Sequence, residues 1–315
     1  MGKWRKKRVC AATVLLMCTA VLLAWCRAHE YTAAPLRMPV MGIVCLASED
    51  DWKDEQYRLL EEQAQANGFD CMIMRTERTQ QAQIDAIRAL IVYRVDVIMF
   101  SPIVQSGWEN VLREAEDAQI PVITVDRRLH HRDGYQAVSS VSFPYREGAH
   151  RAAAWLRGQS VGTAAELYGT LNASSAQEIS RGFREGLEGS ELLLKYSLCG
   201  DDLRSRGREI METFVQEYPD VTLVLAQNDA MALGAIDYLK NNGIQPGQDI
   251  HLAVFGGGEE IRCRLADGEV NLVILCDNTV LAQKAVQTAL HLLKDHSAPI
   301  QVSVPVTLLT GEDTV

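Results

Sequence analysis

From residue 38 onward, the chain alternates short apolar runs with segments of helical periodicity. Expected strands lie at 39–46, 69–74, 96–100, 121–125, 164–168, 192–197, 221–226 and 250–255. Expected helices lie between them at 51–67, 80–93, 105–119, 146–158, 174–187, 203–217 and 229–242. Short, uniformly apolar strands that alternate with helices are typical of parallel sheets covered on both faces. Because there are two such series, we expect two doubly wound α/β lobes.

The charge is unevenly distributed along the 315 residues. The chain has 31 Lys and Arg against 41 Asp and Glu, but residues 1–30 hold six basic side chains and one acid. The remaining body therefore carries a net charge of −15. Nucleic acid binding needs clustered basic side chains, so a body this acidic argues against it. An apolar fraction of 47% excludes wholesale disorder.

The N-terminal segment has the pattern of an export signal or a membrane anchor. Residues 1–8 carry five positive charges, and residues 9–25 are uncharged and mostly apolar. As a helix this run spans roughly 25 Å, against about 30 Å for the hydrocarbon core. Residues 23–26 (LAWC) resemble a bacterial lipoprotein box. We expect residues 1–30 to anchor the protein to the membrane, either uncleaved or lipidated, and the alternative is a cleaved signal that leaves the body free. In either case the body would lie outside the cytoplasm.

No motif of an enzyme, a metal site or a cofactor site stands out. The GxxxxGK[ST] and HExxH patterns are absent, and the glycines at 256–258 lack dinucleotide-binding spacing. The eight cysteines form no CxxC pair, so neither a zinc site nor a thioredoxin-like motif is supported. His130 and His131 with Asp133 fit a solvated loop. We therefore expect no catalytic residues, no metal and no cofactor.

Polar side chains follow several of the expected strands, at Trp52, Lys53, Asp126, Arg127, Asn172 and Asn228. In open α/β sheets, ligands bind beyond the carboxyl ends of the strands. An indole, a carboxylate, a guanidinium and amides suit a polyhydroxylated ligand, because each hydroxyl both donates and accepts. Structural roles without ligand contact remain open for these residues. Trp52 could serve lobe packing, Asp126 and Arg127 could form a local ion pair, and Asn228 could be only a helix N-cap.

Several long segments resemble the type I periplasmic sugar-binding proteins, of the ribose- and galactofuranose-binding kind. They lie at 101–127, 166–170, 200–214 and 226–235, and the resemblance extends over about residues 38–310. It implies two lobes joined by three crossings that close on a sugar. Lobe 1 would comprise 38–140 plus 277–298, and lobe 2 would comprise 141–276 plus 299–315.

The same resemblance assigns ligand contacts to Trp52, Lys53, Asp126, Arg127 and Asn228. Ile179, Gly256 and Leu275 stand where the family has polar side chains, so we expect little charge on the lobe 2 side of the cleft. The implied function is an extracytoplasmic receptor that binds a monosaccharide-like ligand for an ABC permease. The alternative is a membrane-anchored sugar sensor that signals to a histidine kinase or a chemotaxis-type partner.

Overall fold

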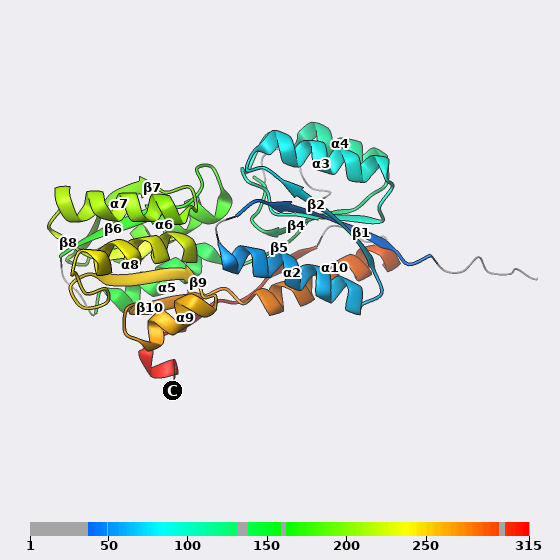
Figure 1. Ribbon diagram of the computed structural model, residues 1–315. Coiled ribbons are helices and arrows are strands. Elements are labelled where there is room, and N and C mark those ends of the chain that lie inside the picture. Colours follow the sequence, from blue (N-terminus) through cyan, green and yellow to red (C-terminus); the bar gives the residue numbers. More distant parts are fainter. Residues whose placement is uncertain (1–36, 49, 131–137, 159–161, 296–299, 315) are drawn as a thin grey trace, which may run out of the picture. The chain divides into compact units, whose positions relative to one another are not determined.

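The first lobe is built on a parallel sheet whose central strands, β1, β3 and β4, are largely apolar and buried. In the computed structural model, which describes residues 37–48, 50–130, 138–158, 162–295 and 300–314, its strand order is β11-β5-β4-β3-β1-β2. The strands are β1 (Val40–Leu46), β2 (Asp70–Thr76), β3 (Val97–Phe100), β4 (Val122–Asp126), β5 (Ser139–Ser142) and β11 (Gln301–Ser303). Helices α3 (Gln80–Val92) and α4 (Glu109–Asp117) cover one face, and α2 (Asp51–Ala66) and α10 (Asn278–Asp295) cover the other (Figure 1).

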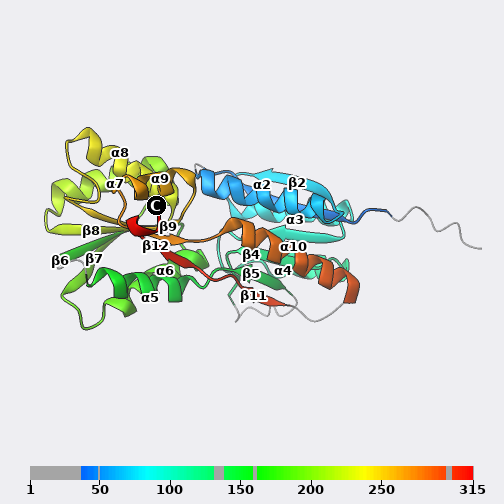
Figure 2. The same ribbon diagram turned by 90° about the horizontal axis from the view of Figure 1, so that it is seen from below.

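The second lobe repeats this architecture with one antiparallel edge strand. Its sheet has the order β12-β10-β9-β8-β6-β7, and β12 runs antiparallel to β10. The strands are β6 (Gly162–Tyr168), β7 (Leu192–Cys199), β8 (Val221–Ala226), β9 (His251–Gly256), β10 (Leu272–Leu275) and β12 (Thr307–Leu309). Figure 2 shows α5 (Tyr145–Leu156) and α6 (Ser174–Leu187) on one face, and α7 (Arg204–Glu217) and α8 (Asp229–Asn241) on the other. The elements α9 (Glu259–Ala266) and η2 (Gly311–Thr314) complete the lobe. This confirms the expected fold class.

One apolar core runs through both lobes. Residues 39–315 form one compact unit. Its largest buried cluster joins side chains of α2 and α10 in the first lobe to side chains of α5 and α6 in the second. At the crossings, Phe143 lies 6.3 Å from the ring of Trp52 and 5.8 Å from that of Tyr145. Burial of this apolar surface stabilises the arrangement by about 25 cal/mol per Å².

The lobe boundaries differ from the expected ones at two crossings. Strand β5 continues to Ser142, and β11 pairs in parallel with β5 in the first sheet. The chain therefore leaves the first lobe after Ser142 rather than Ser140, and makes its last crossing after Ser303 rather than at 298–299. The sequence QVS of β11 carries no apolar run that would mark a strand, and its pairing with β5 defines it.

The other expected elements agree with the structure to within two residues, except for the helix at 105–119. The observed helix α4 is shorter than expected and begins only at Glu109. Gly107 in the preceding loop has φ +86°, a left-handed conformation that a right-handed helix does not accommodate. Trp108 is fully buried against Phe100, with ring centroids 5.1 Å apart, and serves the core of the first lobe.

Candidate functional site

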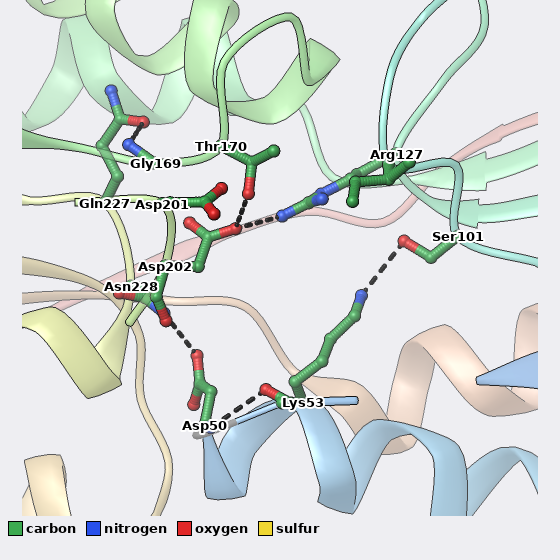
Figure 3. Close-up of polar contacts among 12 residues, drawn as sticks. Asp50, Lys53, Ser101, Arg127, Gly169, Thr170, Asp201, Asp202, Gln227 and Asn228 are labelled. Atoms are coloured by element: carbon green, nitrogen blue, oxygen red, sulfur yellow. Dashed lines mark hydrogen bonds and ion pairs between the residues drawn. The ribbon is translucent and has the colours of Figure 1, made fainter. Parts of the chain in front are cut away.

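A cavity of about 50 Å³ lies where the carboxyl ends of the two parallel sheets face each other. Lobe 1 contributes the start of α2 and the residues that follow β2 and β4, and lobe 2 contributes the residues that follow β7 and β8. The polar lining comprises Ser48, Asp50, Lys53, Arg78, Asp126, Arg127, Tyr145, Ser175, Asp202, Gln227 and Asn228. Figure 3 shows Asp50, Lys53, Arg127, Asp202, Gln227 and Asn228 among them. Charged groups of both signs thus converge on one small space.

Asp126 ends β4 in a strained turn that aims its carboxylate across the cavity. Its φ is +71°, and the Arg127 amide donates to the Val125 carbonyl at 2.8 Å, which closes a three-residue turn. Lys53 Nζ lies 2.6 Å from Asp126 Oδ2. The Tyr145 hydroxyl donates to Asp126 Oδ1. The carboxylate is therefore held by both lobes, through Lys53 and Tyr145.

Lys53 is buried and forms the start of a hydrogen-bonded chain to the hinge. Its ammonium donates to Gln56 Oε1 at 2.6 Å and to the hydroxyl of Ser101 at 3.1 Å, besides Asp126. Gln56 donates to Asn278 Oδ1 at 3.0 Å, and Asn278 donates to the Trp52 carbonyl at 2.8 Å. Burial lowers the pKa of Lys53, and the charge of Asp126 opposes that effect only in part. The cavity is thus linked to the second crossing, where Asn278 begins α10.

Trp52 lines the cavity but also serves lobe packing. Only 9% of its surface is exposed, and its ring packs against Phe143 at the first crossing. The indole Nε1 donates to the Cys276 carbonyl at 3.1 Å, at the second crossing. Trp52 therefore lines the cavity and also packs between the lobes, so each of the two interpretations drawn from the sequence describes part of its environment.

Arg127 reaches across the cavity to the second lobe. Its Nη2 lies 2.6 Å from Asp202 Oδ2, which also accepts from the Thr170 hydroxyl at 2.7 Å (Figure 3). Its Nε is buried without a hydrogen-bond partner among the described residues. The alternative of a local ion pair between Asp126 and Arg127 is wrong, because each of the two forms its ion pair with a different residue.

Asn228 is an N-cap and an interlobe contact at once. Its Oδ1 accepts from the Met231 amide of α8 at 3.0 Å, and its Nδ2 donates to Asp50 Oδ2 at 2.8 Å. Asp50 in turn caps α2 by accepting from the Trp52 amide at 3.1 Å. Burial, with the nearby charge of Asp229, raises the pKa of Asp50. Two helix caps from opposite lobes are therefore joined by one hydrogen bond.

Asn172 does not reach the cavity. Its side chain is exposed in a turn, and its backbone carbonyl accepts from the Gln105 amide of the first lobe at 3.0 Å. It contributes to the contact between the lobes through the backbone. Its left-handed conformation, with φ +62°, is what an asparagine tolerates in such a turn.

The expectation that lobe 2 brings little charge to the cleft is wrong. Ile179 is only 1% exposed and belongs to the apolar core under α6, so a polar group there would not face the cavity. Gly256 has φ +131°, and a Cβ there would lie 2.3 Å from Asp229 Oδ1. The charge on this side comes from Asp202, in the turn after β7. Its position after a strand end was the signal that could have identified it.

Further groups in the cavity were also missed by sequence reasoning. Arg78, after β2, donates to the Asp201 carbonyl at 2.7 Å and to Thr170 Oγ1 at 3.1 Å. Gln227, after β8, accepts from the Gly169 amide at 2.9 Å and donates to the buried Glu166 at 2.7 Å. Each follows a strand end, as the residues singled out from the sequence do.

No metal-binding cluster of His, Cys, Asp and Glu is found among the described residues. His131 and Asp133, which were expected in a solvated loop, lie outside them. The described cysteines, Cys45, Cys71, Cys199, Cys263 and Cys276, are free thiols. Residues 158–162 read GQSVG and match the GxSxG pattern. A nucleophile elbow joins a strand to the following helix, whereas here helix α5 precedes and strand β6 follows.

Within the described part of the chain, no helix has both the length and the apolar character needed to cross a membrane.

Comparison with known proteins agrees with this architecture. The family model of the periplasmic binding protein domain matches residues 41–297. The galactofuranose-binding protein YtfQ of Escherichia coli (strain K12) is 32% identical over 246 residues, which cover 76% of each chain. A Mycobacterium smegmatis structure in complex with β-D-fucofuranose has a TM-score of 0.83 at 29% identity, over 88% of this chain and 92% of that chain.

A third relative comes from Shewanella sp. ANA-3. It is the periplasmic binding protein component of the arabinose ABC transporter, bound to α- and β-L-arabinofuranose. Its TM-score is 0.82 at 29% identity, over 87% of this chain and 93% of that chain.

The two lobes, their crossings and the family match define the class of this protein: the chain belongs to the periplasmic binding proteins. More particularly, it is a type I periplasmic sugar-binding protein, as the sequence resemblance implied. Membership of this family places the body outside the cytoplasm. YtfQ and the Shewanella protein are named as binding proteins rather than enzymes.

Proposed function

We propose that this receptor binds a monosaccharide in its furanose ring form, in the interlobe cavity, and delivers it to an ABC permease. Three relatives at 29–32% identity are named for, or contain, a furanose sugar: galactofuranose, β-D-fucofuranose and L-arabinofuranose. The observation that carries the proposal within this chain is the buried Arg127 Nε, a donor without a described partner beside the carboxylate of Asp126.

The cavity chemistry supports a hydroxyl-rich ligand. A sugar hydroxyl can accept from Arg127 Nε and donate to a carboxylate oxygen, so that both groups are satisfied. The ring of Trp52 adds an apolar wall. Contacts from both lobes converge on this cavity, so a ligand held there would stabilise lobe closure about the three crossings.

Calorimetry with sugars of defined ring size tests the proposal. The panel comprises D-galactose, L-arabinose and D-fucose, with methyl β-D-galactofuranoside against methyl β-D-galactopyranoside. We expect the furanoside to bind at least tenfold more tightly than the pyranoside. Arg127→Gln should weaken binding by about tenfold or more, because hydrogen bonds to charged groups contribute about 1.5–3 kcal/mol. Arg113→Gln, on the exposed surface of α4, is the matched control. Preference for the pyranoside, or no binding, contradicts the proposal.

We also propose that residues 1–30, which lie outside the described residues, tether the receptor to the membrane. The basic start and the uncharged run at 9–25 support this. Fractionation of cells that express the full chain should recover the protein with membranes, and recovery wholly in the soluble fraction contradicts the tether. The sensory alternative depends on this same segment.

A further inference from the structure

The turn after β7 presents a largely buried carboxylate, that of Asp202, from lobe 2 to the arginines of lobe 1. Asp201 and Asp202 both adopt left-handed conformations, with φ +52° and +60°. These conformations are sparsely populated by residues other than glycine, so the surrounding contacts must hold the turn. The Asp202 side chain is 13% exposed, and its Oδ2 accepts from both Arg127 and Thr170. The turn is thereby fixed with this carboxylate facing the cavity (Figure 3).

The cations that line the cavity each have a defined counter-charge. Lys53 pairs with Asp126 at 2.6 Å, and Arg127 pairs with Asp202 at 2.6 Å. Arg78 Nη2 lies 3.9 Å from Asp202 Oδ2 as well, although it also contacts the half-exposed Asp201. Asp202 therefore offsets the charge of Arg127 and shares that of Arg78.

Asp202 is ionised in this environment. Burial would raise the pKa of its carboxyl, but the charge of Arg127, the hydrogen bond from Thr170 and the charge of Arg78 together hold it below its ordinary value. The counter-charge is thus a permanent part of the cavity at neutral pH.

We infer that Asp202 is a specificity-determining residue, which neutralises the arginines of the cavity and so selects neutral sugars over anionic ones. This rests on the proposed sugar-binding function. A neutral hydroxyl can accept from the free Nε of Arg127 while the ion pair stays intact. A ligand carboxylate that approached Arg127 would meet the like charge of Asp202 a hydrogen-bond length away. Asp202 thereby adds to the negative charge of Asp126 in the same cavity and disfavours an anionic ligand.

D-Galactose and D-galacturonate are the probes, because they differ only in a hydroxymethyl group against a carboxylate. Calorimetry should show wild type binding galactose at least tenfold more tightly than galacturonate. Asp202→Asn should shift that ratio toward galacturonate by about tenfold or more, since Arg127 and Arg78 lose a counter-charge. Asp220→Asn is the control, because Asp220 pairs with Lys195 on the surface of lobe 2 at 2.8 Å. Its ratio should equal that of wild type.

An unchanged ratio in Asp202→Asn, or wild type that binds galacturonate as tightly as galactose, overturns the inference. A second measurement keeps the test independent of the sugar. Urea unfolding should show that Asp202→Asn has a lower free energy of unfolding than Asp220→Asn. The double variant that combines Arg127→Gln with Asp202→Asn should regain part of the stability that Asp202→Asn alone loses. If that pattern holds while wild type binds no sugar of the panel, the proposed function fails and the counter-charge role of Asp202 stands. Equal stability of the two single variants refutes that role.

Discussion

The indole of Trp52 donates a hydrogen bond to the backbone carbonyl of Cys276, 3.1 Å away, and so ties the start of α2 to the second crossing between the lobes. The two residues are 224 positions apart in the chain. Cys276 is 1% exposed, so its carbonyl has little access to water as a substitute partner. The side chain that forms a wall of the cavity therefore also restrains the hinge.

Trp52→Phe removes this hydrogen bond and keeps an aromatic ring near Phe143. We expect the free energy of unfolding to fall by about 1–3 kcal/mol, because a buried carbonyl is left unsatisfied. Urea denaturation followed by circular dichroism measures the change. Trp155→Phe, at a half-buried position on α5, is the control and should cost less. Equal losses would show that ring size, not the contact with Cys276, determines the effect.

Asn278→Ala breaks the chain of hydrogen bonds from the hinge to Lys53. The variant removes the acceptor of the Gln56 side-chain amide. Gln56, which accepts a hydrogen bond from the ammonium of Lys53, is then no longer held in position. We expect galactose affinity to fall by roughly threefold to tenfold, equivalent to about 1 kcal/mol, as measured by calorimetry.

Asn271→Ala is the matched control for this chain. Asn271 likewise makes two hydrogen bonds, in its case both to backbone, with Leu252 and Gly247 at 2.8 and 2.9 Å, but it lies in lobe 2 away from the cavity. It should lower stability and leave galactose affinity unchanged. If both variants weaken binding equally, the loss reflects stability alone and the chain has no role in positioning Lys53.

The alternation of strands and helices was predictable because it is a local signal. Strands such as β3 and β4 are continuous apolar runs, and that pattern alone indicates burial on both faces. Strands β5 (SSVS) and β11 (QVS) were not predicted, since they contain few apolar residues and are defined by pairing, β5 with both β4 and β11, and β11 with β5. Contacts distant in sequence define them, and no short window contains that information.

The candidate site was predictable in position but not in its pairings. Lys53, Asp126, Arg127 and Asn228 follow strand ends, and parallel strands bring their ends to one edge. Which acidic side chain pairs with which basic side chain depends on how the two lobes pack against each other. That is why the partner of Arg127 proved to be Asp202, from the other lobe.

Stability should decrease as the pH rises from about 4 to 6.5, through the buried carboxyl of Asp229. Burial raises the pKa of Asp229 from 3.8 to about 6, although the amides of Gly257 and Gly258 donate to it. The folded state then binds more protons than the unfolded state between these values. Asp229 thus contributes on the order of 2–3 kcal/mol to the free energy of unfolding. This contribution is complete below about pH 4 and is lost as the pH rises past 6. Urea unfolding across this pH range measures it.

Asp229→Asn should remove this component of the pH dependence, because the variant has no carboxyl to titrate. The raised pKa of Asp50 acts in the same direction and remains in the variant. Asp237→Asn, on the same helix α8 but paired with Arg204 and 39% exposed, is the control. It should retain the slope of wild type. A slope in Asp229→Asn equal to that of wild type would exclude Asp229 as its source.

Ile179→Arg should destabilise the protein rather than strengthen sugar binding. The family resemblance implies an arginine at this position, but Ile179 is 1% exposed and packs in the core with Phe183 and Leu187. A guanidinium there would be buried without a counter-charge, and a buried, unpaired charge costs several kcal/mol. We expect a fall of about 3–5 kcal/mol in the free energy of unfolding, measured in urea. Gln177→Arg, on the exposed face of the same helix, should change it by less than about 0.5 kcal/mol. If Ile179→Arg folds with wild-type stability and tightens galactose binding, α6 presents this position to the cavity and its assignment to the core is wrong.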